Sequence, residues 1–283
     1  MEVINAVKSR GPEILARWNL KMNPDKTEEF QIDNKLKEWK HSKKLGTILG
    51  ETEELEARMN KATQKLYECK ALWKKKHGMS EMLKIRLYKV FIQSVLLYNC
   101  GTWALTRENL EKLERFQRNT LRKILNIHYP NKISRKAIYK RTKVEKLEPQ
   151  IAKARLDLFG KMLRGDCNSP ALFWLREYFD TTNLKARRGK ICTNLLKILQ
   201  QDMKDANYCL NNTEDLNKLI YIARRQSETW SAIVERVLMK ANERSNLALK
   251  PTQVQLPTHG ATLRNMIPRK TRIEEANQRM LRN

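Results

Sequence analysis

Glycine and proline are scarce in this sequence, which has only 9 glycines and 8 prolines in 283 residues. Because these two residue types supply most tight turns, their scarcity favours long helices over a sheet with many turns. Long apolar runs are missing too. The longest apolar cluster, at residues 90–97, contains Gln93 and Ser94 and is too short to span a bilayer, and the first residues lack the apolar centre of a signal peptide. The sequence therefore predicts a mainly α protein with no membrane partner.

Metal ligands and disulfide partners are also sparse. The five cysteines are widely spaced and odd in number, and no Cys-x-x-Cys pair occurs. The four histidines lie in separate segments, away from any pair of cysteines. This pattern argues against a disulfide framework and against a zinc site, and it fits a reducing compartment. We expect an intracellular protein, in the nucleus or the cytoplasm.

Adjacent aspartates are absent as well. Nucleotidyl transfer needs acidic side chains that hold two metal ions close together, but the chain contains no Asp-Asp pair, and its aspartates are isolated. A glycine-rich phosphate loop, a Gly-x-Ser-x-Gly elbow and a His-Glu-x-x-His motif are also missing. Nothing in the residues themselves predicts catalytic residues, a metal site, a cofactor or a small-molecule substrate.

Positive charge is abundant. The chain has 57 Lys and Arg against 31 Asp and Glu, a net charge of +26. Cationic side chains displace counterions that are condensed on phosphate backbones, so a surplus of this size favours a polyanionic partner. We expect the backbone of RNA or DNA to be that partner, in preference to an anionic membrane.

Helical periodicity covers most of the chain. It predicts helices over residues 51–76, 80–98, 107–125, 134–147, 149–164, 192–206 and 213–245, with Ser80 and Thr106 as N-caps of the second and third. The helix of residues 80–98 is apolar on nearly all sides after Leu87, which predicts the central core element. Short strands are expected at residues 28–32 and 44–49. The aromatic cluster at residues 171–180 is interpreted as a satellite core rather than as a platform for bases.

The helix of residues 107–125 is amphipathic. Leu110, Leu113, Leu121 and Ile124 line one face, and the opposite face carries a row of cations. These cations are the first candidates for phosphate contact, although a solvated face of an ordinary helix would look the same: Lys112, Arg115, Arg118, Arg122 and Lys123. A basic loop supplies the second candidates, Arg187, Arg188 and Lys190.

Several motifs occur in a recognisable order. Leu45-Gly46 precedes a Tyr98-x-x-x-x-Trp103 corner between two helices, and an Arg155-Leu-x-x-x-Gly-x-x-x-Arg helix and the helix of Trp230 follow. This order and spacing resembles the region of non-LTR (LINE-type) retrotransposon reverse transcriptases that runs from the end of the palm through the thumb and beyond it. The resemblance covers roughly residues 11–237. The Cys/His knuckle at the end of some relatives is absent here.

The resemblance implies a small α+β palm remnant at residues 1–58, a helical thumb at 59–130, a helical extension at 131–250 and a basic, disordered tail at 251–283. It implies that Leu45 and Gly46 grip a primer terminus, and that Tyr98 and Trp103 pack at the helix junction. Lys26 would sit near a nucleotide triphosphate only if the rest of a palm were supplied, and Mg²⁺ would belong to that full polymerase.

We therefore interpret the chain as a truncated distal fragment of an RNA-directed DNA polymerase that is catalytically inactive alone and retains sequence-independent binding of template–primer. Whether it is an enzyme stays open at this point, because the competing interpretation is that the chain polymerises by itself. Two further interpretations stay open as well: a repurposed basic helical interaction module, and a non-functional retrotransposon relic.

Overall fold

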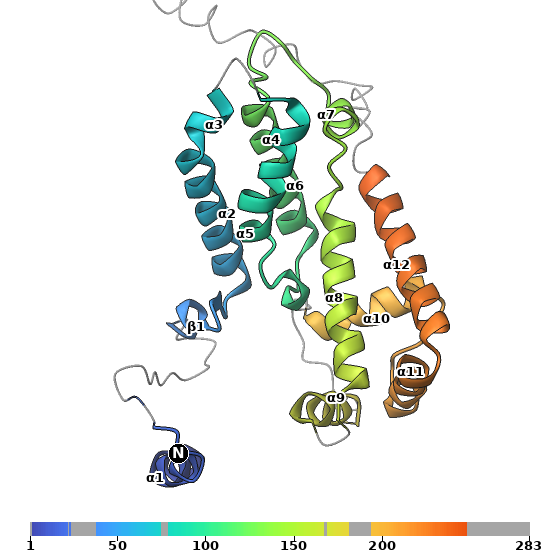
Figure 1. Ribbon diagram of the computed structural model, residues 1–283. Helices are drawn as coiled ribbons and strands as arrows, with labels where there is room; N and C mark the ends of the chain where they lie inside the picture. Colours follow the sequence, from blue (N-terminus) through green and yellow to red (C-terminus); the bar gives the residue numbers. More distant parts are fainter. Residues whose placement is uncertain are drawn as a thin grey trace, which may run out of the picture. The chain divides into compact units, whose positions relative to one another are not determined.

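The computed structural model describes residues 2–21, 23, 38–74, 79–166, 169–180 and 194–247 (Figure 1). Lys26, the strand predicted at residues 28–32, the cations Arg187, Arg188 and Lys190, and the tail at 251–283 lie outside the described residues. The expected boundary at residue 58 falls inside a helix, whereas the boundary at residue 130 falls in a connection between helices.

The fold is mainly α-helical, as predicted. One two-stranded antiparallel sheet, made of β1 (Lys43–Lys44) and β2 (Thr47–Ile48), is the only sheet in the described ranges. The helices before residue 130 are α1 (Glu2–Ala16), the 3₁₀ helix η2 (Glu38–His41), α2 (Glu51–Glu68), α3 (Lys70–Lys74), α4 (Glu81–Leu87), the π-helix η3 (Tyr88–Gln93), α5 (Ser94–Leu96), the 3₁₀ helix η4 (Cys100–Thr102) and α6 (Arg107–Ile124). Those after it are α7 (Arg135–Thr142), α8 (Leu147–Arg164), α9 (Pro170–Asp180), α10 (Leu195–Asp205), α11 (Thr213–Arg225) and α12 (Ser227–Leu247).

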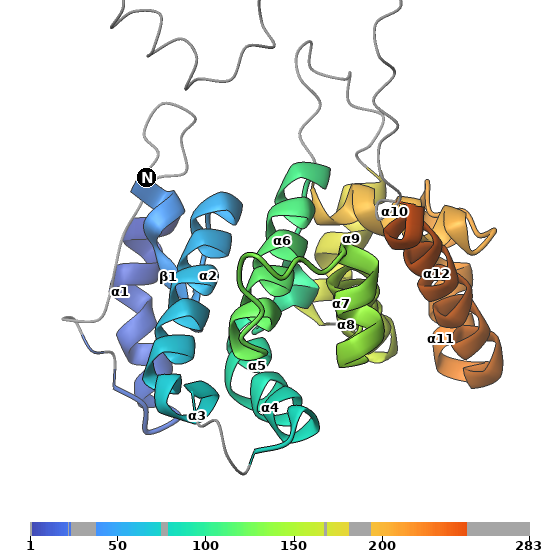
Figure 2. The same ribbon diagram turned by 90° about the horizontal axis from the view of Figure 1, so that it is seen from above.

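The segment α4–η3–α5 is contacted by α2 and by α7. Ser80 caps α4 by accepting a hydrogen bond from the Leu83 N–H, as predicted. α2 contacts η3, α5 and α6, and α2, α5 and α6 lie side by side in the view from above (Figure 2). Tyr88, Ile92 and Leu96 are fully buried, as a core element requires, but Val90 and Phe91 are 62% and 44% exposed, so this apolar segment is not covered on all sides. One face of this helix has no covering element in the part of the chain that the structure describes.

The second group surrounds α8. Its core contains Leu156, Phe159 and Leu163 of α8 together with apolar side chains of α9, α10, α11 and α12. The helix predicted at residues 213–245 is broken at Gln226, which leaves the helical conformation at φ −126° and ψ 70°. The break lets Leu216 of α11 and Trp230 of α12 reach the same core, which helical spacing alone cannot reveal.

The aromatic cluster at residues 171–180 forms helix α9. Phe179 is buried in the second core and Tyr178 packs partly against it, as the satellite-core prediction requires. Phe173 and Trp174 are 58% and 67% exposed and touch edge to face, so for them the prediction is wrong. An 11-residue amphipathic helix has only one inward face, and these two residues lie on the other.

Candidate nucleic-acid interface

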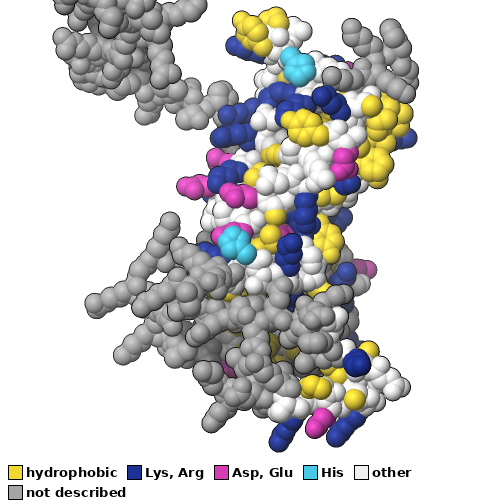
Figure 3. Space-filling model, turned by 90° about the vertical axis from the view of Figure 1, so that its left-hand side faces the viewer, with side chains coloured by type: hydrophobic (Ala, Val, Ile, Leu, Met, Phe, Trp, Pro, Cys, Tyr) yellow, Lys and Arg dark blue, Asp and Glu magenta, His cyan; other side chains and the backbone are white. Residues whose placement is uncertain are grey.

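Exposed lysines and arginines occur on most helices, and an acidic neighbour neutralises some of them. On α2, Lys65 Nζ lies 2.6 Å from Glu68 Oε2, and on α12, Lys240 Nζ lies 3.3 Å from Glu243 Oε2. Figure 3 shows such a mixture of basic, acidic and hydrophobic side chains over the side of the molecule on which α2 lies. Paired cations leave little net charge for a polyanion. A phosphate-binding surface therefore requires exposed cations that lack an acidic neighbour.

Helix α6 presents such cations. Thr106 caps it, as predicted, because its hydroxyl oxygen accepts the Asn109 N–H at 3.3 Å. The face with Leu113, Leu121 and Ile124 is buried. Lys112, Arg115 and Lys123 are exposed on the opposite side, and no ion pair joins them to any residue that the structure describes. With a rise of about 1.5 Å per residue, Lys112 and Lys123 stand roughly 16 Å apart along the helix axis.

Arg118 and Arg122 do not belong to this exposed face, and the prediction that they do is wrong. Arg118 is only 9% exposed, and its Nη1 lies 3.5 Å from Glu114 Oε2. Arg122 is half-buried and donates to Asn119 Oδ1 at 3.2 Å and to the Ile133 carbonyl oxygen at 3.4 Å. Both are long side chains whose head groups fold back from the edge of the exposed face. Arg122 thereby ties α6 to the connection that follows it, whereas the Arg118 contact stays within α6.

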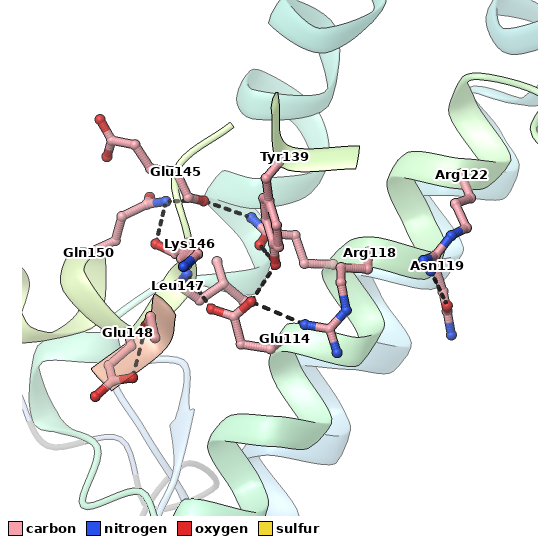
Figure 4. Close-up of polar contacts among 12 residues, drawn as sticks. Glu114, Arg118, Asn119, Arg122, Tyr139, Glu145, Lys146, Leu147, Glu148 and Gln150 are labelled. Atoms are coloured by element: carbon pink, nitrogen blue, oxygen red, sulfur yellow. Dashed lines mark hydrogen bonds and ion pairs between the residues drawn. The ribbon is translucent and has the colours of Figure 1, made fainter. Parts of the chain in front are cut away.

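Glu114 joins three helices at this flank of α6 (Figure 4). Its Oε1 accepts the Leu147 N–H at 2.8 Å, and its Oε2 accepts a hydrogen bond from the Tyr139 hydroxyl. Lys146, the N-cap of α8, supplies no side-chain cap, so Glu114 satisfies a free N–H of the α8 N-terminus from another helix. Burial raises the pKa of Tyr139, and the negative charge of Glu114 raises it further.

We expect Glu114→Ala to lower the free energy of unfolding by about 1.5–3 kcal/mol, because it removes a charged acceptor from the Leu147 N–H and from Tyr139. Urea denaturation measures this loss. Glu111→Ala is the matched control, since the Glu111 side chain is 60% exposed and only reaches Arg107 at 3.5 Å. Equal losses in the two variants would contradict the bridging role of Glu114.

Leu45 and Gly46 form the turn of a β-hairpin, so the strand predicted across residues 44–49 is instead two strands that pair. Both turn residues have positive φ, 49° and 78°, as a type I′ turn requires. Arg58 of α2 donates from Nη2 to the Gly46 carbonyl oxygen at 2.6 Å. Glu54 accepts the Arg58 Nε–H at 2.6 Å and the Ile48 N–H at 2.8 Å. A buried ion pair on α2 therefore fixes the hairpin.

The corner after α5 holds the same turn from another direction. The Tyr98 hydroxyl donates to the Leu45 carbonyl oxygen at 3.2 Å, and the Arg58 guanidinium lies 4.5 Å from the centroid of the Tyr98 ring. Tyr98 is half exposed, whereas Trp103 is buried as predicted. The Leu45 side chain, 88% exposed, projects from a turn whose backbone is held at both residues.

The other motif residues meet inside the second core. Arg155 of α8 donates from Nε to Asp202 Oδ2 of α10 at 2.7 Å, and the side chains of both are almost fully buried. Gly160 faces Trp230 of α12 so closely that a Cβ at this position would lie 3.0 Å from the indole ring. The sequence alone does not reveal Asp202 as a partner, because an isolated acid within a helix gives no sign of a contact far along the chain.

No group of three or more His, Cys, Asp or Glu side chains in the described part of the chain could hold a metal ion. No helix among the described residues is both long and apolar enough to cross a membrane.

No protein-family model, no curated protein and no solved structure matches this chain.

Proposed function

We propose that this chain is the distal part of a LINE-type reverse transcriptase, and that it binds the phosphate backbone of template–primer duplex, independently of sequence, through α6. The observation that carries this proposal is the row of Lys112, Arg115 and Lys123, which are exposed and have no acidic partner among the described residues. DNA duplex carries one negative charge per about 1.7 Å of axis, so a row of this length faces several phosphates. Backbone contacts of this kind position a protein without reading sequence.

The packing of the motif residues supports the assignment to that family. Residues that carry the resemblance are dispersed from Leu45 to Trp230 in the sequence, yet several contact one another. Tyr98 binds the Leu45-Gly46 turn, and Gly160 receives Trp230. Packing between motif residues constrains their spacing in the sequence, which supports the proposed membership of that family. In this proposal the motif residues stabilise the fold, and the α6 cations bind the nucleic acid.

The triple variant Lys112→Gln/Arg115→Gln/Lys123→Gln tests the proposed interface. We expect it to bind a short blunt duplex more weakly, and to flatten the slope of log K against log salt concentration by about 0.9 for each phosphate that the protein no longer neutralises. Fluorescence anisotropy across a salt series gives both quantities. Thermal unfolding should stay nearly unchanged, because these side chains make no ion pair with any described residue.

The matched control is Lys153→Gln/Lys161→Gln/Arg236→Gln, which removes the same charge from exposed positions of α8 and α12. A control variant that flattens the slope as much as the α6 variant would show that the binding is a diffuse effect of net charge. An α6 variant that keeps the wild-type slope would overturn the proposed interface.

A further inference from the structure

A second strongly basic surface adjoins α6. From Lys112 to Lys143 the chain has one acidic residue, Glu114, and that carboxylate is engaged by Tyr139 and the Leu147 N–H. The same stretch carries many cations: Lys112, Arg115, Arg118, Arg122, Lys123, Lys132, Arg135, Lys136, Lys140, Arg141 and Lys143. The α6–α7 connection (residues 125–134) and α7 with its C-cap supply the last six of these.

Helix α7 turns most of its cations outward. Ile138 and Tyr139 are buried on its inner face. Lys136, Lys140 and the C-cap Lys143 recur at intervals of four and three residues and are exposed. Arg141 is excluded from this face, because its Nε donates to Glu81 Oε2 at 3.1 Å. No acidic side chain lies on α7. By contrast, Lys65 of α2 and Lys240 of α12 each have an acidic partner on their own helix.

The α6–α7 connection carries a highly exposed aromatic ring. Both of its ends are fixed, since Asn126 Nδ2 donates to the Trp73 carbonyl oxygen at 3.3 Å and Arg122 binds the Ile133 carbonyl oxygen. Tyr129 between them is 86% exposed, and Lys132 follows it, also exposed. In Figure 1 this connection is the green segment that arches over to α7. A tyrosine that is almost fully exposed beside a lysine, on a loop whose ends are fixed, does not serve as a core residue.

We infer that Tyr129, Lys132 and the outer face of α7 form a binding site for an unpaired nucleic-acid strand. One base stacks on the Tyr129 ring, and phosphates of that strand lie against Lys132, Lys136 and Lys140. The inference rests on the proposed function, and it adds a second site for the strand that leaves the duplex. Bases inside a duplex are already stacked and cannot reach Tyr129, whereas an unpaired base offers its π-face. The cations give affinity for any polynucleotide, and the ring selects the unpaired strand.

Two probes separate this site from α6: a short blunt duplex, and the same duplex with a single-stranded extension. Wild-type protein should bind the extended duplex more tightly. Tyr129→Ala should weaken binding of the extended duplex about tenfold, the loss typical of one base–aromatic stack, and should leave the blunt duplex within about twofold. Lys132→Gln/Lys136→Gln/Lys140→Gln should reduce the salt slope more for the extended duplex than for the blunt duplex. Tyr67→Ala, at another exposed tyrosine, is the matched control.

Different results would refute the α6 interface and the unpaired-strand site. Equal wild-type affinity for the two probes would overturn the unpaired-strand site while leaving α6 binding of the blunt duplex intact. Tyr129→Ala with wild-type affinity for the extended duplex, or a Tyr67→Ala loss of the same size, would also overturn it. So would tight binding to vesicles of anionic lipid together with no preference for the extension, which would assign this surface to a membrane. No binding of the blunt duplex would instead refute the α6 interface.

Discussion

Asp202→Ala should lower the free energy of unfolding by about 3–5 kcal/mol, the loss typical of a buried ion pair from which one partner is removed. Asp202 is 2% exposed and Arg155 is 8% exposed, and their contact joins α10 to α8. Without the carboxylate, the Arg155 guanidinium remains in the core with its charge uncompensated. Urea denaturation followed by circular dichroism measures the loss.

Two further variants separate the charge effect from the packing effect. In Arg155→Leu/Asp202→Leu both charges are gone, and we expect this variant to be markedly more stable than Asp202→Ala, because an apolar pair carries no desolvation cost. Asp157→Ala removes an exposed acid from α8 and should change stability by less than about 0.5 kcal/mol. A loss for Asp202→Ala no larger than that for Asp157→Ala would contradict the structural role of the pair.

Gly101→Ala should be the other large effect. Gly101 in η4 lies against the backbone of α8, and a Cβ there would approach the Ala154 carbonyl oxygen to 2.7 Å. The obstacle is helical backbone, which cannot rotate away as a side chain can. η4 and α8 would therefore have to separate, and overpacking of this kind costs about 1–3 kcal/mol, occasionally more. The shift of the urea midpoint reports the change.

Gly11→Ala provides the comparison for that substitution. Gly11 lies within α1, and an added Cβ would meet nothing within 4 Å, so alanine there should be neutral or slightly stabilising. Similar midpoints for Gly101→Ala and wild-type protein would mean that η4 and α8 do not pack as closely as the structure has them.

Local signals in the sequence predict much of the fold. Helix α6 differs from its predicted range by one residue, at its C-terminal end. The prediction is this close because the Thr106 cap and the 3.6-residue apolar period both lie within the segment itself. The Ser80 cap of α4 is predictable for the same reason. These features depend on neighbours only a few residues away, so they can be recognised without knowledge of the tertiary structure.

Features set by distant contacts are not predictable in this way. Helical spacing places Arg118 on the cationic face of α6, but a long side chain can turn toward a carboxylate, and Glu114 withdraws this one from solvent. The Gln226 break, the close approach at Gly101 and the pairing of Asp202 with Arg155 likewise depend on which helices meet. The absence of acids from residues 115–143 is visible in the sequence, but only the structure shows which of the cations there are exposed.

Sequence-independent binding of nucleic-acid backbone is tested most directly by the salt dependence of wild-type binding. Affinity for two blunt duplexes of unrelated sequence should be equal and should fall linearly on a log–log plot, with a slope of about −0.9 for each phosphate contacted. The α6 row alone predicts a slope of roughly −3 or steeper. Undetectable binding at low salt, or an affinity that does not change with salt, would contradict the account.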